Sequence, residues 1–214
     1  MKNWRIWLIL ASIVIAGALV YFSLSLFDNT QPYEGTEIGG EAPDFQLTDQ
    51  NGSVINLSDF RGKVVALTFM DSKCKDTCPI TAAHFRKAYQ QLNQNEASLV
   101  VFLGVNVNVE ASAVADILGI THAWHLEEIP SWHFLTGGRE ELEPVWKDYA
   151  VIVEHVHDGS TIMHTPGVFL IDPLGQERWY VSTVISGEGN TDLALPLSEL
   201  LVKHIREILN ENER

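Results

Sequence analysis

Three nearly continuous apolar runs stand out along the chain, and each has the length of one strand. They cover 63–70, 99–105 and 167–171. Runs in which apolar and polar positions do not alternate are typical of strands that are buried on both faces of a sheet. We therefore predict that these three segments form the centre of one sheet.

Segments with helical spacing separate these runs. Residues 79–94 begin with Pro79 near the first helical position, 111–118 form a short helix ended by Gly119, and 193–209 form a closing amphipathic helix. A further helix over 139–149 turns Leu142, Val145 and Trp146 inward; additional strands are predicted at 44–47, 54–57, 132–135 and 178–183. The hairpin signal at 50–52 and the alternation of elements predict α/β layers with a central mixed sheet and a strand pair at one edge.

An uncharged apolar segment of 22 residues, 6–27, precedes this pattern. It is long enough to cross a hydrocarbon core of about 30 Å, and Lys2 and Arg5 precede it. The positive-inside rule then places 1–5 in the cytoplasm and the remainder outside. Because the apolar run exceeds that of a cleavable signal peptide, we favour an uncleaved single-pass anchor in a cell membrane, a flexible stalk over 28–40 and one domain over 41–210.

The charge balance excludes some partners. The chain carries a formal charge of −14, and because Lys2 and Arg5 precede the anchor, the outer part carries −16. Such a surface argues against binding of nucleic acid and against docking on anionic lipid. It identifies no partner by itself.

Cys74 and Cys78 are the only cysteines in the chain, and they lie between the 63–70 strand and the 79–94 helix. The start of a helix favours an anion, so this setting favours the thiolate, which is both the nucleophile and the metal-binding form. If the first turn extends back to Cys74, both sulfurs share one helical face. Such a pair can close a disulfide or bind a soft metal.

The order of motifs now resembles known domains. Residues 40–45, 49–52 and 62–65 are similar to the start of thioredoxin-like redoxin domains. Within that group, the Cys74–Cys78–Pro79 motif, with His164 eight residues before the 172–175 turn, resembles the Sco/SenC copper proteins, as do 132–137, Val145, Trp146 and Tyr149. The chain departs from that family at Lys75, Asp76 and Met163 and over 105–112.

This resemblance implies a copper site. Cys74 and Cys78 would donate sulfur and His164 nitrogen, a set that suits Cu(I) and accepts Cu(II). Asp71 is a candidate supporting residue, although a solvated loop carboxylate is the simpler interpretation. The implied function is that of an extracytoplasmic metallochaperone, which delivers copper to a respiratory enzyme subunit during assembly of cytochrome c oxidase or a related enzyme. A thioredoxin-like reductant would maintain the dithiol.

A thiol–disulfide oxidoreductase is the alternative, with Cys74 and Cys78 as its redox pair. Pro166 favours it, because thioredoxins hold a cis-proline at the corresponding place. A peroxidase is set aside, since Asp71 and Leu67 stand where peroxiredoxins have a hydroxyl residue and a proline. The remaining histidines, which are His84, His122, His125, His133, His155, His157 and His204, are interpreted as packed or solvated side chains.

Overall fold

A computed structural model describes residues 33–155, 162–183 and 195–212, together with Trp4, Trp7, Leu8, Leu10 and 14–18. Most of the predicted anchor, 6–27, thus lies outside the described residues. Within the described part, no helix has both the length and the apolar character needed to cross a bilayer. Residues 34–214 group as one compact unit and 1–33 as another.

Eight of the described strands form one mixed sheet, in the order β1-β10-β9-β4-β5-β6-β2-β3. Its centre is built from the predicted apolar runs: β4 and β5 are parallel, and β9 lies antiparallel to β4 on the other side. Every residue of β4 and β5 is buried. The strands are β1 (Thr36–Glu37), β2 (Gln46–Asp49), β3 (Val54–Asn56), β4 (Val64–Met70), β5 (Val100–Asn106), β6 (Trp132–Thr136), β9 (Gly167–Ile171) and β10 (Glu177–Ser182).

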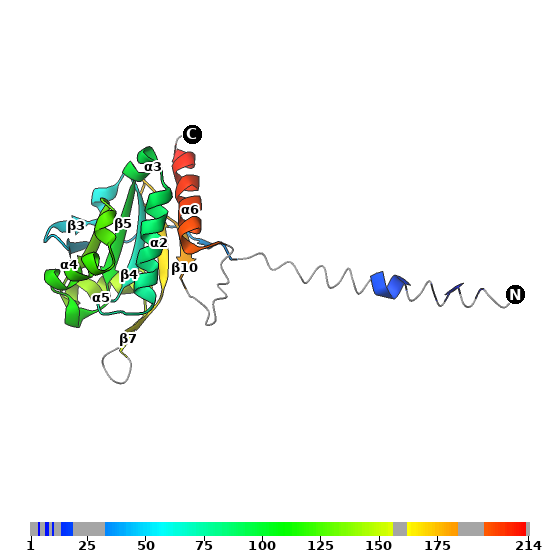
Figure 1. The fold of residues 1–214 in the computed structure, drawn as a ribbon, viewed down its shortest axis with the longest axis horizontal. Coiled ribbons are helices and arrows are strands. Elements are labelled where there is room, and N and C mark those ends of the chain that lie inside the picture. Colours follow the sequence, from blue (N-terminus) through cyan, green and yellow to red (C-terminus); the bar gives the residue numbers. More distant parts are fainter. Residues whose placement is uncertain are drawn as a thin grey trace. The chain divides into compact units, whose positions relative to one another are not determined.

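Helices cover both faces of the sheet (Figure 1). The core on one face contains residues of α2 (Thr77–Gln91), α4 (Val114–Ala123) and α6 (Leu197–Asn212), with α2 and α6 in contact. The core on the other face contains Leu142, Val145 and Trp146 of α5 (Arg139–Asp148), as predicted. A short helix, α3 (Gln94–Ser98), follows α2, and β7 (Val153–His155) pairs with β8 (Ile162–His164) in a separate hairpin.

Two helix boundaries differ from the predictions. Helix α2 begins at Thr77, so Pro79 occupies its first turn, where a missing N–H is tolerated. Helix α4 does not end at Gly119 but runs to Ala123, and the left-handed residue that follows it is His125, with φ of 56°. Its start is fixed at Val114, since the Asp116 carboxylate accepts from the Ala113 N–H at 3.2 Å.

The C-terminal part of the predicted stalk, 28–40, is folded into the domain. Strand β1 pairs with β10, and the Ile38 N–H donates to the Arg178 carbonyl at 2.9 Å. Glu34 forms an ion pair with Lys203 of α6. The composition of this segment predicted flexibility, but main-chain pairing at a sheet edge requires no particular side chains.

Candidate metal centre

Both cysteines lie where β4 passes into α2. Cys74 is in the connecting loop, and Cys78 is in the first turn of α2 with its side chain only 4% exposed. The helix therefore does not extend back to Cys74, and the two sulfurs do not share a helical face. Instead, the Cys78 N–H donates to the Cys74 sulfur at 3.3 Å, so this sulfur accepts one of the unpaired N–H groups at the helix start.

This arrangement makes the two thiols unequal. A hydrogen bond from the Cys78 thiol to the Cys74 sulfur, together with hydrogen bonds from main-chain N–H groups, lowers the pKa of Cys74 to about 5. Partial burial of Cys74 opposes this shift. The same hydrogen bond and the burial of Cys78 raise the pKa of Cys78 well above its usual range. Cys74 is thus a thiolate at neutral pH, and Cys78 is a protonated thiol that donates to it.

The unequal pKa values predict selective alkylation. Iodoacetamide should modify Cys74 first, with a rate that reaches its plateau above about pH 6 and falls about tenfold per pH unit well below 5, because only the thiolate reacts. Mass spectrometry of each cysteine between pH 4 and 9.5 measures this profile, and Cys74→Ser should remove the fast phase. Equal rates for the two cysteines, rising only above pH 8, would contradict it.

His164 reaches the same place from a distant part of the chain. It is the last residue of β8, and its Nε2 lies 4.0 Å from the Cys78 sulfur, across a sequence separation of 86 residues. Its Nδ1 lies 3.1 Å from the Thr165 carbonyl oxygen. A carbonyl can only accept, so Nδ1 carries the hydrogen, and in the neutral ring Nε2 keeps its lone pair facing Cys78.

Hydrogen bonds on both sides fix the segment that carries His164. The Thr165 hydroxyl accepts from the Ile152 N–H at 3.0 Å, and the Tyr180 hydroxyl donates to the Pro166 carbonyl at 2.7 Å. Gly167 lies against the Tyr180 ring so closely that a Cβ would stand 2.3 Å from it. The peptide bond before Pro166 is trans, unlike that of the thioredoxin proline to which it was compared.

Asp71 is not the solvated loop carboxylate of the simpler interpretation. It is buried, and its Oδ1 accepts from the Lys73 N–H and from the Asn108 side chain, each at 2.8 Å. The Asp71 carbonyl in turn accepts from the Cys74 N–H at 3.0 Å. The carboxylate therefore shapes the loop that presents Cys74. The partner amide follows β5 and is far away in sequence, which is why local pattern did not reveal it.

The donor set suits a soft metal, although the site is not closed around one. A thiolate and an imidazole bound to one metal lie about 3.6–3.8 Å apart at ordinary bond lengths, close to the 4.0 Å between Cys78 and His164. Among the described residues, no group of three or more histidine, cysteine, aspartate or glutamate side chains is already arranged for a metal ion. Binding through all three predicted ligands therefore requires a rearrangement of their side chains.

The other histidines divide into packed and exposed side chains. His204, to which the sequence assigned no role, is buried, with Nε2 2.7 Å from the Glu34 carbonyl and its ring stacked on Trp179. His133 contacts Asp49 at 3.1 Å. His122 and His125 are exposed, and the His84 Nδ1 accepts from the Ser198 N–H at 3.4 Å. His155 ends β7, and His157 lies outside the described residues.

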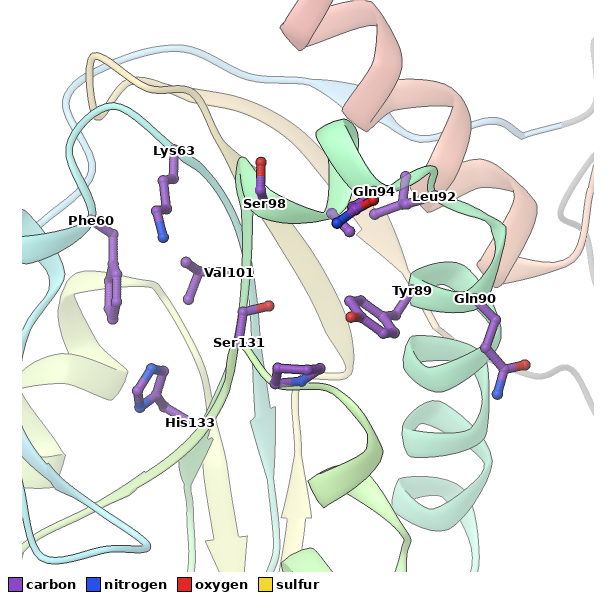
Figure 2. A pocket seen from close by; sticks show the side chains of 12 residues that line it. Phe60, Lys63, Tyr89, Gln90, Leu92, Gln94, Ser98, Val101, Ser131 and His133 are labelled. Atoms are coloured by element: carbon purple, nitrogen blue, oxygen red, sulfur yellow. The ribbon is translucent and has the colours of Figure 1, made fainter.

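A cavity of about 650 Å³ lies at the other end of the sheet and shares no residue with the cysteine site. In Figure 2, Lys63 and His133 extend toward each other beside Phe60, while Tyr89 lines the cavity from α2. Lys63 precedes β4, whereas Cys74 follows it, so the length of that strand separates the two places. The reactive sulfur and this cavity are therefore independent features.

Comparison with known proteins agrees with this geometry. The chain is 26% identical over 182 residues to an SCO2-like protein of Rickettsia conorii, covering 79% of this chain and 85% of the relative. It superposes with a TM-score of 0.65 on Bradyrhizobium japonicum ScoI with copper bound, at 22% identity, covering 79% of this chain and 99% of the other.

A SCO1/SenC family lipoprotein of Bacillus anthracis gives the same TM-score at 21% identity, covering 84% of this chain and 98% of the other. These superpositions confirm the predicted thioredoxin-like fold. The SCO1/SenC family model matches residues 34–193. The chain therefore belongs to the SCO1/SenC family.

Proposed function

We propose that this protein is a membrane-anchored, extracytoplasmic copper carrier that delivers copper during assembly of cytochrome c oxidase or a related respiratory enzyme. The observation that carries the proposal is the approach of His164 Nε2 to within 4.0 Å of the Cys78 sulfur, beside the Cys74 thiolate. Two sulfurs and one imidazole form a donor set that selects Cu(I) over harder ions.

Solved relatives support copper as the cargo. The Bradyrhizobium japonicum, Arabidopsis thaliana and yeast proteins are each described with copper bound. BsSco is described as a member of the Sco family of cytochrome c oxidase assembly proteins and as having a disulfide switch. The receiving partner of this chain would accordingly be a copper-binding subunit of a respiratory enzyme.

The chain's own residues suit capture and release. Cu(I) would displace the proton of the Cys78 thiol, and Cys74 is already deprotonated at neutral pH. Three ligands leave one side of the ion open, so a partner's thiol could enter before Cys74 or Cys78 departs. Closing a Cys74–Cys78 disulfide would remove both sulfur ligands, and a thioredoxin-like reductant would restore them.

The placement outside the cytoplasm rests on the sequence. The uncharged run 6–27, with Lys2 and Arg5 before it, supports a single-pass anchor with the domain on the outer side. The described lipoprotein character of the Bacillus anthracis neighbour supports association of such a domain with a membrane. Extraction of native membranes with alkaline carbonate tests the anchor, because a spanning segment should stay in the pellet.

Metal analysis tests the carrier function. The reduced protein should bind one Cu(I) per chain, and the disulfide form should bind none, because its sulfurs are no longer thiolates. His164→Ala should lower Cu(I) affinity by at least about 10–100-fold, the usual cost of losing even a hydrogen-bond partner of a metal ligand. Alkylation of Cys74 should stay nearly unchanged, since imidazole donates to the metal and not to the alkylating reagent. His122→Ala, which removes an exposed histidine, is the matched control.

Stoichiometric copper binding that is unaffected by the loss of His164, together with rapid disulfide exchange, would favour the second candidate, a thiol–disulfide oxidoreductase. The observation behind that candidate is the contrast between the Cys74 thiolate and the protonated Cys78 thiol. A thiol–disulfide oxidoreductase ResA of Bacillus cereus is 28% identical over 99 residues, covering 46% of this chain and 56% of the relative.

In such a reaction, the Cys74 thiolate would attack a partner disulfide and release one partner thiolate. Cys78, after losing its proton, would then attack Cys74 and release the second. The partner disulfide ends as two thiols, and Cys74–Cys78 ends as a disulfide.

A further inference from the structure

A groove of about 600 Å³ opens beside the Cys74 sulfur. The loop before α2 forms one wall, and the end of α4 forms the other. We call it the Cys74 groove, and its lining residues are Ser72, Lys73, Cys74, Lys75, Pro79, Ile120, Ala123 and Trp124. The groove is distinct from the cavity of Figure 2, because the two share no lining residue.

The wall from α4 is apolar and rigidly held. Ile120 and Trp124 are partly buried and pack against the core, and the Trp124 ring is stacked on Phe134 with ring centres 6.3 Å apart. Ala123 between them is exposed and has only a methyl group, which leaves room for a side chain from outside. An aromatic side chain that packs against the core on one side and lines a groove on the other is a typical contact for a bulky apolar group.

The opposite wall carries two exposed lysines. Lys73 and Lys75 flank Cys74, and both side chains are exposed. Neither forms an ion pair with any residue that the structure describes. The whole chain has 28 acidic against 14 basic residues, so two free cations beside the reactive sulfur contrast with the average surface. Asp76, also exposed, is the acidic neighbour on the same loop.

We propose that the Cys74 groove docks a segment of the copper-receiving protein in which a cysteine is flanked by an acidic residue and a bulky apolar residue. The acidic residue would lie against Lys73 and Lys75, and the apolar side chain would contact Ile120 and Trp124 above Ala123. The partner's sulfur then stands at Cys74, where metal or disulfide exchange would occur. The inference rests on the proposed function for its partner and adds the means of recognition.

Reaction rates with activated peptides test this docking. Three peptides of equal length, each with one cysteine as its thionitrobenzoate disulfide, would be flanked by glutamate and leucine, by lysine and leucine, or by serines. The Cys74 thiolate attacks the peptide sulfur, the peptide–thionitrobenzoate S–S bond breaks, and thionitrobenzoate leaves as a coloured thiolate. Each rate is divided by the rate with neutral 4,4′-dithiodipyridine, which corrects for changes in Cys74 itself.

The glutamate–leucine peptide should react about tenfold faster than the lysine–leucine peptide at low salt, and 0.5 M salt should remove most of this advantage. The expectation runs against the net charge of the protein, which alone would favour the lysine peptide. A lysine peptide that reacts at least as fast as the glutamate peptide would overturn the proposal.

Substitutions in the chain test whether the peptide preference arises in the Cys74 groove. Lys73→Glu combined with Lys75→Glu should reverse the peptide preference, and Ala123→Trp should slow both leucine peptides by filling the groove without removing core packing. Lys63→Glu reverses one lysine at the far end of the sheet (Figure 2), half the charge change of the loop variant, and should leave the preference intact. If the Lys63 variant alters the preference as the loop variant does, the groove is not the docking site. Copper affinity, measured separately, decides the carrier function whichever result the peptides give.

Discussion

Replacing either cysteine with serine is expected to abolish tight Cu(I) binding, with a loss of affinity on the order of a thousandfold or more. A serine hydroxyl is a hard, protonated ligand that Cu(I) binds poorly, whereas both thiols can supply soft thiolates. The substitution keeps nearly the same shape, so Cys74→Ser retains an acceptor for the Cys78 N–H, which now lies 3.3 Å from the sulfur. Competition against a Cu(I)-specific chelator measures the affinity of each variant.

Met163→Leu is the matched control for these variants. Its thioether is also a soft sulfur ligand, it precedes His164, and its side chain is 62% exposed. Its neighbour His164 points the other way in strand β8, because successive side chains alternate across a strand. We expect unchanged copper affinity in Met163→Leu. Retention of tight binding in both serine variants, or a loss in Met163→Leu as large as in them, would show that the proposed ligand set is wrong.

The sheet could be predicted because the residues of each central strand identify it without reference to the rest of the chain. The runs that become β4, β5 and β9 are apolar at consecutive positions, and the structure places all three side by side in the centre. The hairpin of β2 and β3 was likewise visible in the Asn51–Gly52 turn between two short apolar segments. Burial on both faces leaves few alternatives for such segments.

Helix ends and buried polar contacts were less predictable. Gly119 suggested a helix end, yet it lies inside α4, because α4 packs against β6 and the η3 turn (Leu126–Glu128) beyond it. Tertiary packing of this kind overrides the modest cost of an internal glycine. Asp71 was interpreted as solvated, but it is bound by Asn108, which is distant in sequence. His204 was given no role for the same reason, because its partner Glu34 is also distant in sequence.

The candidate site likewise contains residues that local pattern predicts and one that it does not. The pairing of Cys74 with Cys78 could be inferred from their spacing and from the helix that follows. His164 could be added only through the family resemblance, since no local pattern distinguishes it from the other histidines. Its approach to Cys78 depends on β9 lying next to β4, which positions the segment that precedes β9 near the end of the cysteine strand.

Packing beneath α2 supports the site, because this helix carries Cys78. Residues Cys78, Ala82, Phe85 and Ala88 form the buried face of this helix, at the spacing of successive turns. Phe85 is fully buried, and its ring contacts those of Phe102 and Trp132, with ring centres 5.4 Å and 6.1 Å apart. It therefore anchors the helix that holds Cys78 against the sheet.

Phe85→Ala is accordingly expected to lower the free energy of unfolding by about 3–5 kcal/mol, the usual cost of removing a buried aromatic side chain and leaving a cavity. Urea unfolding of the reduced protein, followed by tryptophan fluorescence, measures the change. Ile80→Ala on the same helix removes a side chain that is 44% exposed, and this control should cost less than about 1.5 kcal/mol. Losses of similar size in the two variants would mean that α2 is not anchored through Phe85. A large loss confined to Phe85→Ala would show that the aromatic core anchors the helix that carries Cys78.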